Sequence, residues 1–210
     1  MLGILGGTFD PIHYGHLRLA LEFADGLGLE EVLLVPAGTP PHRDAPVAHA
    51  EERATMAAAA VAGEPRLRVD RRELERPGPS YAVDTLEALR RDHPHTPLCF
   101  LMGMDAFQGL HHWHRWRQIP ELAHIGIAGR PGSAPPQGPP GELLQRHQVD
   151  RPSQLNETLA GRILILQVPM LDISASRIRR LVATGRSPRY LLPDPALQII
   201  RRQGLYEHES

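Results

Sequence analysis

Short runs of consecutive apolar residues, each followed by a break that contains glycine or proline, constrain the fold of this chain more than any other feature. Because the residues are apolar in succession and do not alternate with polar ones, the runs predict strands buried on both faces. Helical patterns separate the runs, which predicts an α/β fold with a doubly wound, mostly parallel sheet and right-handed crossovers. The expected strands are Leu2–Leu5, Val32–Val35, Leu98–Met102, Ile125–Ala128 and Ile163–Val168, and the expected helices are about Gly15–Leu27, Ala50–Ala62, Val83–Arg91, Ser174–Thr184 and Pro195–Gln203.

The length of 210 residues suits one ordinary domain, and we expect a single domain over residues 1–210. Residues 132–152 include the stretch GSAPPQGPPG, which predicts a surface loop or an insertion. Residues 174–210 are expected to form a C-terminal helical portion. No repeat divides the chain further.

The charge balance argues against two classes of partner. The chain has 23 basic and 24 acidic residues, a net charge of -1, and only 5% aromatic residues. A nucleic-acid-binding protein would be expected to carry a basic excess and more aromatic side chains. A membrane span needs an apolar run of ~20 residues, and the sequence has no such run.

Every basic residue is arginine, which excludes a P-loop, Schiff-base or protein-kinase lysine. Phosphate chemistry here would have to use arginine, histidine and backbone N–H groups.

Cysteine usage bears on the compartment. Cys99 is the only cysteine, so the chain has no internal disulfide and no multi-cysteine zinc site. The N-terminus lacks the basic and long apolar regions of a signal peptide, and a cytoplasmic location is expected. The sequence leaves open whether the protein forms a homo-oligomer.

The segment that follows the first expected strand predicts an anion site. Gly6 and Gly7 let backbone N–H groups approach a phosphate closely, and the helix that begins next adds its partial positive charge. His13 and His16 lie three residues apart at the start of that helix, on one face, where both can donate to the same polyphosphate. Two glycines alone would more often form only a tight turn, and no third ligand completes a zinc site, so no protein metal site is predicted.

A second candidate anion site follows the last apolar run. Ser174 is the predicted N-cap of a helix, Ser176 lies in its first turn, and Arg179 follows one turn later. A helix start with a second hydroxyl and an arginine can hold an anion. A capped surface helix with solvated arginines is the alternative that these residues leave open.

Both strings resemble motifs of one superfamily. GGTFDPIHYGH is similar to the signature of nucleotidyltransferases with an HxGH motif, most closely to that of bacterial nicotinate-nucleotide adenylyltransferases, and ISASRIR resembles the ISSTxxR motif that accompanies it. The resemblance covers nearly the whole chain and implies a Rossmann-like nucleotidyltransferase fold. The ATP-binding residues that it implies are Gly6, Gly7, Thr8, Phe9, His13, His16, Arg130, Ser174, Ser176 and Arg179, with His13, His16 and Arg179 as the catalytic ones.

The middle of the chain adds further matches to the same family. PPHR, SYAVDTL and the stretch from Phe100 to Trp116 resemble its segments near the nucleotide acceptor. The substrate-binding residues implied are His42, Tyr81, Ala82, Asp105 and Trp113, with Asp105 on the ribose and Trp113 stacked on the pyridine ring. The chain departs from the family at Ala82, where threonine is usual, and at His114, where an aromatic residue is frequent. Backbone N–H groups around Tyr81–Asp84 would then have to recognise a carboxylate on the ring.

The resemblance implies adenylyl transfer from ATP to nicotinate mononucleotide, with deamido-NAD and pyrophosphate as products. Such a transfer needs positioning and charge stabilisation more than proton chemistry, which agrees with the lack of an evident acid/base pair. Mg²⁺ is the expected cofactor, bound mainly through the ATP phosphates. Nicotinamide mononucleotide or pantetheine phosphate as acceptor, and a nucleotide-sensing module without catalysis, are the alternatives.

Overall fold

The structure is a computed structural model that describes residues 1–41, 45–129, 136–169 and 171–207. It divides the chain into two compact units. The first consists of Met1–Gly6, Leu19–Leu33 and Tyr81–Pro169, and the second of Gly7–Arg18, Leu34–Ser80 and Met170–Ser210. The single domain expected from the length stays a prediction.

The doubly wound sheet is confirmed. Its strand order is β3-β2-β1-β4-β5-β6, and β1, β4, β5 and β6 pair in parallel, for example Leu2 with Leu98 and Cys99 with His124. The chain order reverses between β1 and β4, and in such sheets ligands bind beyond the carboxyl ends of the strands at that point. The strands are β1 (Leu2–Gly7), β2 (Glu31–Pro36), β3 (Leu67–Val69), β4 (Leu98–Gly103), β5 (His124–Gly129) and β6 (Ile163–Gln167).

The five strands and five helices expected from the sequence are all present, with ends within two residues of the expected ones. The reason is visible in α1 (Tyr14–Leu27), whose Leu17, Ala20, Ala24 and Leu27 recur at helical spacing and are all buried. The three-residue strand β3 was not expected, because so short a segment carries no periodic signal.

The first unit contains the short elements that follow β4. These are α5 (Met104–Gln108), the 3-10 helices η1 (Leu110–His112) and η2 (Trp116–Gln118), and α6 (Ile119–Leu122). Helix α4 (Ala82–Asp92) packs against α6, and Arg90 near its end donates to the backbone carbonyls of Leu122, Thr96 and Leu159 (2.8–2.9 Å). One arginine thus holds three segments of this unit together.

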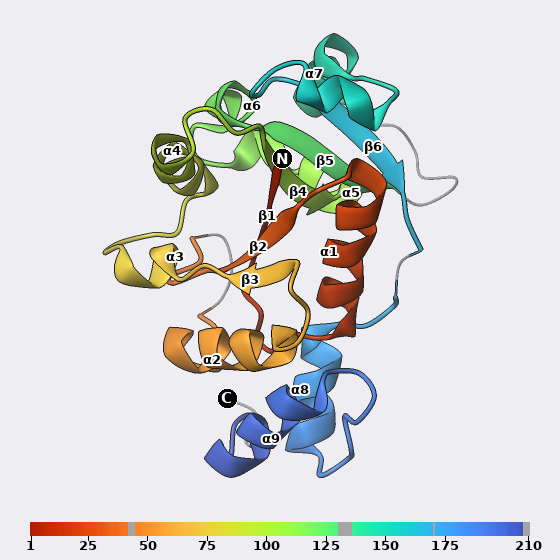
Figure 1. The fold of residues 1–210 in the computed structure, drawn as a ribbon. Helices are drawn as coiled ribbons and strands as arrows, with labels where there is room; N and C mark the ends of the chain where they lie inside the picture. The colour runs from red at the N-terminus through yellow and green to blue at the C-terminus, as the bar shows by residue number, and fades with distance from the viewer. Residues whose placement is uncertain (42–44, 130–135, 170, 208–210) are drawn as a thin grey trace. The chain divides into compact units, whose positions relative to one another are not determined.

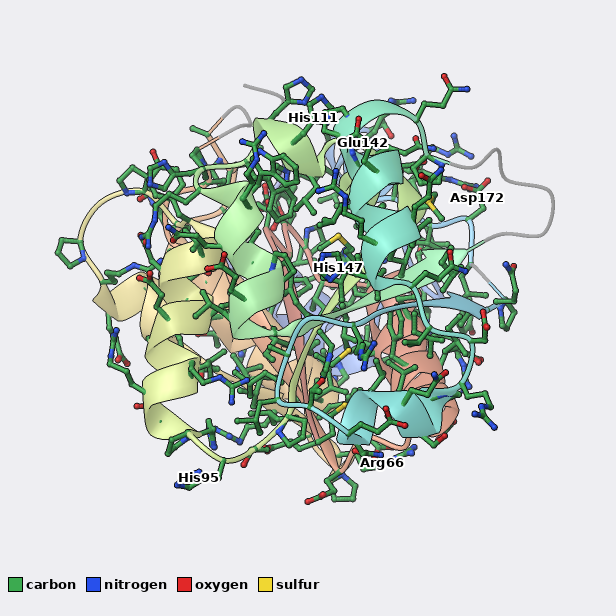
Figure 2. The ribbon with its side chains drawn as sticks, turned by 90° about the horizontal axis from the view of Figure 1, so that it is seen from above. Arg66, His95, His111, Glu142, His147 and Asp172 are labelled. Atoms are coloured by element: carbon green, nitrogen blue, oxygen red, sulfur yellow. The ribbon has the colours of Figure 1, made fainter. Side chains whose placement is uncertain are left out.

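The stretch 132–152, expected to be a surface loop or an insertion, contains helix α7 (Gly138–His147), so the expectation of a loop was wrong there. Its prolines lie in the first turn, where backbone N–H groups have no intrahelical partner and proline is tolerated. Leu144 is buried, and His147, labelled in Figure 2, bonds through Nδ1 to the carbonyl of Gly161 (2.7 Å). The 3-10 helix η3 (Pro152–Asn156) follows.

The second unit contains α2 (Ala50–Val61), α3 (Arg72–Glu75), α8 (Ala175–Ala183) and α9 (Asp194–Gln203). Helices α2 and α9 are far apart in the chain but pack side by side (Figure 1). Ala54 and Ala57 of α2 and Ala196 of α9 are buried, and their small side chains allow close approach. This packing brings the end of the chain back to the segment that follows β1.

Candidate functional site

The turn after β1 has a strained backbone that its packing fixes. Phe9 has a positive φ of 51° and a buried ring, which meets the ring of His16 edge-on at 5.0 Å between centroids. Non-glycine residues rarely adopt this backbone conformation. Gly6 is exposed, and Gly7 and Thr8 are half-buried, so the turn places part of its backbone within reach of a ligand.

His13 and His16 form a stacked pair at the start of α1. Their ring centroids are 3.7 Å apart, and the ring planes differ by 23°. The backbone N–H of His13 donates to Nδ1 of His16 (3.3 Å), so in neutral His16 the proton is on Nε2. The prediction that the two rings share a face is confirmed.

His13 is almost fully buried, and burial lowers the pKa of its imidazole to about 4. At neutral pH the ring is therefore uncharged, and any contact it makes with a phosphate is that of a neutral donor. Its Nδ1 is buried without a hydrogen-bond partner among the described residues. A buried nitrogen without a hydrogen-bond partner destabilises the folded state, and such groups are typical of functional sites.

Gly15 has no side chain, and this makes room for the ring of His13. A Cβ at position 15 would lie 2.9 Å from Nδ1 of His13 and 3.0 Å from its Cε1, closer than real Cβ contacts. It would also lie 3.6 Å from the carbonyl oxygen of Ile173, just before α8. The glycine between the two histidines is therefore explained by steric exclusion.

Helix α8 begins as the sequence predicts. Ser174 is its N-cap, with Oγ accepting from the backbone N–H of Arg177 (3.3 Å), and Ser176 lies in the first turn with its hydroxyl 3.4 Å from that of Ser174. Both serines are exposed. The helix therefore has exposed hydroxyl groups at its positive end, an arrangement that can hold an anion.

Arg179 links α8 to the turn after β1. Its Nη1 donates to the backbone carbonyl of Asp10 (2.6 Å) and lies 3.7 Å from Oδ2 of the Asp10 carboxylate. No other described residue bonds this guanidinium, so Nε and Nη2 keep their donors for another group. The histidine turn and the serine–arginine helix, 169 residues apart at this bond, thus lie together, as predicted.

Two buried groups that the sequence analysis missed support this arrangement. The guanidinium of Arg53, on α2, donates to the carbonyls of Thr8 (2.6 Å), Gly38 (3.1 Å) and Ala48 (3.1 Å). The hydroxyl of Tyr206, after α9, donates to Oδ1 of Asp10 (2.7 Å). Burial lowers the pKa of Arg53, and burial together with the negative charge of Asp10 raises the pKa of Tyr206. Neither residue lies in a motif, so only the packing reveals them.

The residues expected to bind an acceptor lie in the first unit. Tyr81 precedes α4 and Ala82 is its first residue, while exposed Asp105 lies in the first turn of α5. Trp113 is half-buried, with its ring edge-on to Phe100 at 6.1 Å between centroids. Each is therefore at a strand or helix end with part of its surface accessible.

His114, which departs from the family pattern, contacts Tyr81. The two rings stack at 4.2 Å between centroids, with planes 27° apart. The next residue, Arg115, forms ion pairs with Asp84 (3.4 Å) and with Glu87 on α4. The loop that carries Trp113 is thus tied to the start of α4, a contact that the sequence did not indicate.

Two of the expected site residues, His42 and Arg130, lie outside the described residues. Within residues 1–41, 45–129, 136–169 and 171–207, no group of three or more histidine, cysteine, aspartate or glutamate side chains could hold a metal ion. None of the helices described there combines the length and apolar character that crossing a bilayer requires.

Known proteins match this chain over most of its length. The family model described as Cytidylyltransferase-like matches residues 4–181. A protein of Aeromonas hydrophila named "Probable nicotinate-nucleotide adenylyltransferase" is 50% identical over 206 residues, covering 98% of this chain and 96% of that protein. One of the same name from Marinobacter nauticus is 49% identical and covers 97% of this chain and 95% of that protein.

A solved structure also matches over nearly the full length. It is the nicotinic acid mononucleotide adenylyltransferase of Plasmodium falciparum complexed with NaAD, with a TM-score of 0.73, 16% identity, and coverage of 99% of this chain and 98% of that chain. At this level of identity the match shows a shared fold.

Proposed function

We propose that this chain, which belongs to the cytidylyltransferase-like family, transfers the adenylyl group of ATP to nicotinate mononucleotide, giving deamido-NAD and pyrophosphate. The observation that carries the proposal is the hydrogen bond from Arg179 to Asp10, because it joins the two motifs expected to hold a triphosphate. The near-complete coverage of the relatives by this chain supports the same reaction.

Among the described residues, all the candidate triphosphate groups except Gly6 belong to the second unit. In the proposed complex, backbone N–H groups of Gly6–Phe9 and the rings of His13 and His16 bind the phosphates, while Ser176 and Arg179 bind them from the start of α8. A phosphate oxygen of the acceptor attacks the α-phosphorus, and the bond to the bridging oxygen of pyrophosphate breaks. The chain's contribution is in-line positioning and stabilisation of the charge on the leaving group.

The neutral state of His13 fits this role. A buried imidazole with a pKa of about 4 can donate a hydrogen bond at neutral pH without repelling Arg179. His16 is fixed by the backbone N–H of His13, so its Nε2–H is the expected donor. The positive charge of the site would come from Arg179 and the start of α8.

The first unit supplies the candidate acceptor groups. Asp105 would accept from ribose hydroxyls, and Trp113 would stack on the pyridine ring. Because Ala82 lacks a hydroxyl, the ring carboxylate would be bound by backbone N–H groups at the start of α4. The side chain of the N-cap residue Tyr81 does not cap that helix start, and backbone N–H groups in a first turn can bind a carboxylate.

Mg²⁺ is part of the proposal as a partner of ATP. The donors around the two motifs are histidine, serine and arginine, and the Asp10 carboxylate already accepts three hydrogen bonds. This donor set does not form an oxygen cage, and it fits a magnesium ion held by phosphate oxygens and water. When bound, the ion would neutralise charge on the phosphates. A cytoplasmic site of action is proposed as well, because the single cysteine offers no disulfide chemistry.

The proposal is tested by pyrophosphate release from ATP and Mg²⁺ with three acceptors: nicotinate mononucleotide, nicotinamide mononucleotide and pantetheine phosphate. We expect kcat/KM to be highest for nicotinate mononucleotide. A preference for either other acceptor would replace the proposed one. Tight ATP binding without pyrophosphate release on any acceptor would support a nucleotide-sensing module and refute catalysis.

A further inference from the structure

The carboxylate of Asp10 is the centre of a buried hydrogen-bond network in the second unit. Its side chain is only 6% exposed and accepts from the backbone N–H groups of Val47 (Oδ2, 2.9 Å) and Ala48 (Oδ1, 3.2 Å). The hydroxyl of Tyr206 adds a third donor to Oδ1 at 2.7 Å. Three donors from two distant segments therefore fix the carboxylate in one orientation.

The same residue fixes one end of Arg179. Nη1 of Arg179 donates to the Asp10 carbonyl, and the carboxylate lies 3.7 Å from that nitrogen. Because Nη1 is held in this way, the position of Asp10 decides where Nε and Nη2 can point. The Arg179 side chain is 32% exposed, so those donors can reach a ligand.

The C-terminal segment positions Tyr206 beside Asp10. It follows α9, whose Ala196 and Ile200 are buried and which packs on α2, and its own side chain is buried with a raised pKa. The hydroxyl therefore remains protonated at any physiological pH, and it is the donor in its bond to the Asp10 carboxylate. Tyr206 also has a positive φ of 66°, a conformation that non-glycine residues rarely adopt.

We propose that Tyr206 and Asp10 are positioning residues for adenylyl transfer. The Tyr206 hydroxyl orients the Asp10 carboxylate, and Asp10 holds Nη1 of Arg179 so that the remaining guanidinium donors face the triphosphate. This inference rests on the proposed function for the identity of the ligand. It assigns a role in ATP binding to a residue near the C-terminus that belongs to neither motif.

The test is a double-mutant cycle between Tyr206→Phe and Arg179→Ala in the full-length protein, read as kcat/KM for ATP. Tyr206→Phe keeps the ring and leaves Asp10 its two backbone donors, so the fold is expected to survive. We expect a roughly tenfold loss, the scale of one hydrogen bond to a charged group. In the Arg179→Ala protein, Tyr206→Phe should alter kcat/KM less than twofold, because the arginine that Tyr206 positions is no longer present.

A purely structural role gives a different result. Tyr206 would then cause the same fold loss with and without Arg179, and the inference would be refuted. A Tyr206→Phe protein as active as the unmodified one would refute it too. Tyr190→Phe is the matched control, since Tyr190 is 79% exposed, and it should leave ATP kinetics unchanged. Asp10→Asn, which keeps size but removes the charge, should reproduce the loss and its dependence on Arg179.

ATP affinity measured by calorimetry through the same cycle separates this inference from the proposed function. If no acceptor yields pyrophosphate, the proposed reaction fails, while coupling between Tyr206 and Arg179 in ATP affinity would still support the positioning role. If pyrophosphate forms and the cycle shows no coupling in either measurement, the reaction stands and the positioning role falls.

Discussion

The backbone N–H of His13 donates to Nδ1 of His16, and the two rings stack with their centroids 3.7 Å apart. The bond defines which nitrogen of His16 carries the proton, and the stack defines the direction in which it points. The edge of Phe9 supports His16 from another side. The bond and the stack thus hold the HxGH string in one arrangement, in which Nε2 carries the proton of neutral His16.

Replacement of His16 by alanine should lower kcat by at least ~100-fold, on the scale of losing one well-placed donor to developing charge. The measurement is steady-state pyrophosphate release with saturating ATP. Replacement of the exposed His95, labelled in Figure 2, is the control and should leave kcat unchanged. Near-normal turnover of the His16 variant would contradict the role given to it.

Gly15→Ala should disturb the same pair without removing either histidine. The new Cβ would lie 2.9 Å from Nδ1 of His13, so the ring has to move, and kcat/KM for ATP should fall roughly tenfold, about 1.4 kcal/mol. Gly109→Ala is the control, because its Cβ would make only ordinary contacts at 3.7 Å. Equal kinetics for the two variants would show that the contact is relieved without consequence.

Trp113→Ala should act on the acceptor alone. Loss of the stacking surface is expected to raise KM for nicotinate mononucleotide roughly tenfold and to leave KM for ATP within about twofold, on the scale of an aromatic contact. Trp116→Ala provides the comparison, since the ring of Trp116 is covered by Arg117 at 4.6 Å. A parallel rise in KM for ATP would instead indicate a general loss of structure.

Arg90→Ala should destabilise the first unit. The guanidinium bonds the carbonyls of Leu122, Thr96 and Leu159, and its loss leaves these acceptors without their charged donor. We expect the free energy of unfolding to fall by about 2–3 kcal/mol in chemical denaturation. Its exposed neighbour Arg91 is the control, and a change to alanine there should cost less than about 0.5 kcal/mol.

Stability should also fall at acidic pH through His124. This ring is fully buried, bonds the Thr158 carbonyl through Nε2 (3.0 Å) and accepts from the Arg162 N–H at Nδ1 (3.0 Å); burial lowers its pKa. A lowered pKa means that the unfolded chain binds the proton more readily than the folded protein does. The stabilisation of the folded state by His124 is therefore complete above pH ~6.5 and is lost as the pH falls.

Part of the stability lost between pH 7.5 and pH 5 should therefore be attributable to His124. Chemical denaturation at the two pH values should therefore show a smaller difference for His124→Phe than for the unmodified protein. His95→Phe, on the surface, should retain the full difference. An unchanged difference in the His124 variant would mean that the buried ring does not control acid stability.

Much of the fold follows from local pattern. Consecutive apolar residues specify strands such as β4, and the spacing of Leu17, Ala20 and Ala24 specifies a helix, because these periodicities depend only on neighbouring residues. Ser174 as a helix cap is equally local. Helix α7 was missed because its prolines indicated a loop, although proline in a first turn loses no hydrogen bond.

The sequence by itself determined the order of strands and helices and the two motifs expected to bind phosphate. The tertiary structure alone decided which distant groups meet: the Tyr206 hydroxyl at Asp10, 196 residues away, and the guanidinium of Arg53 on carbonyls of the segments that follow β1 and β2. It also decided that His13 is neutral, since a pKa depends on how completely the surroundings exclude water. Neither contact nor burial has a local signature, because both arise only when helices far apart in the chain pack together.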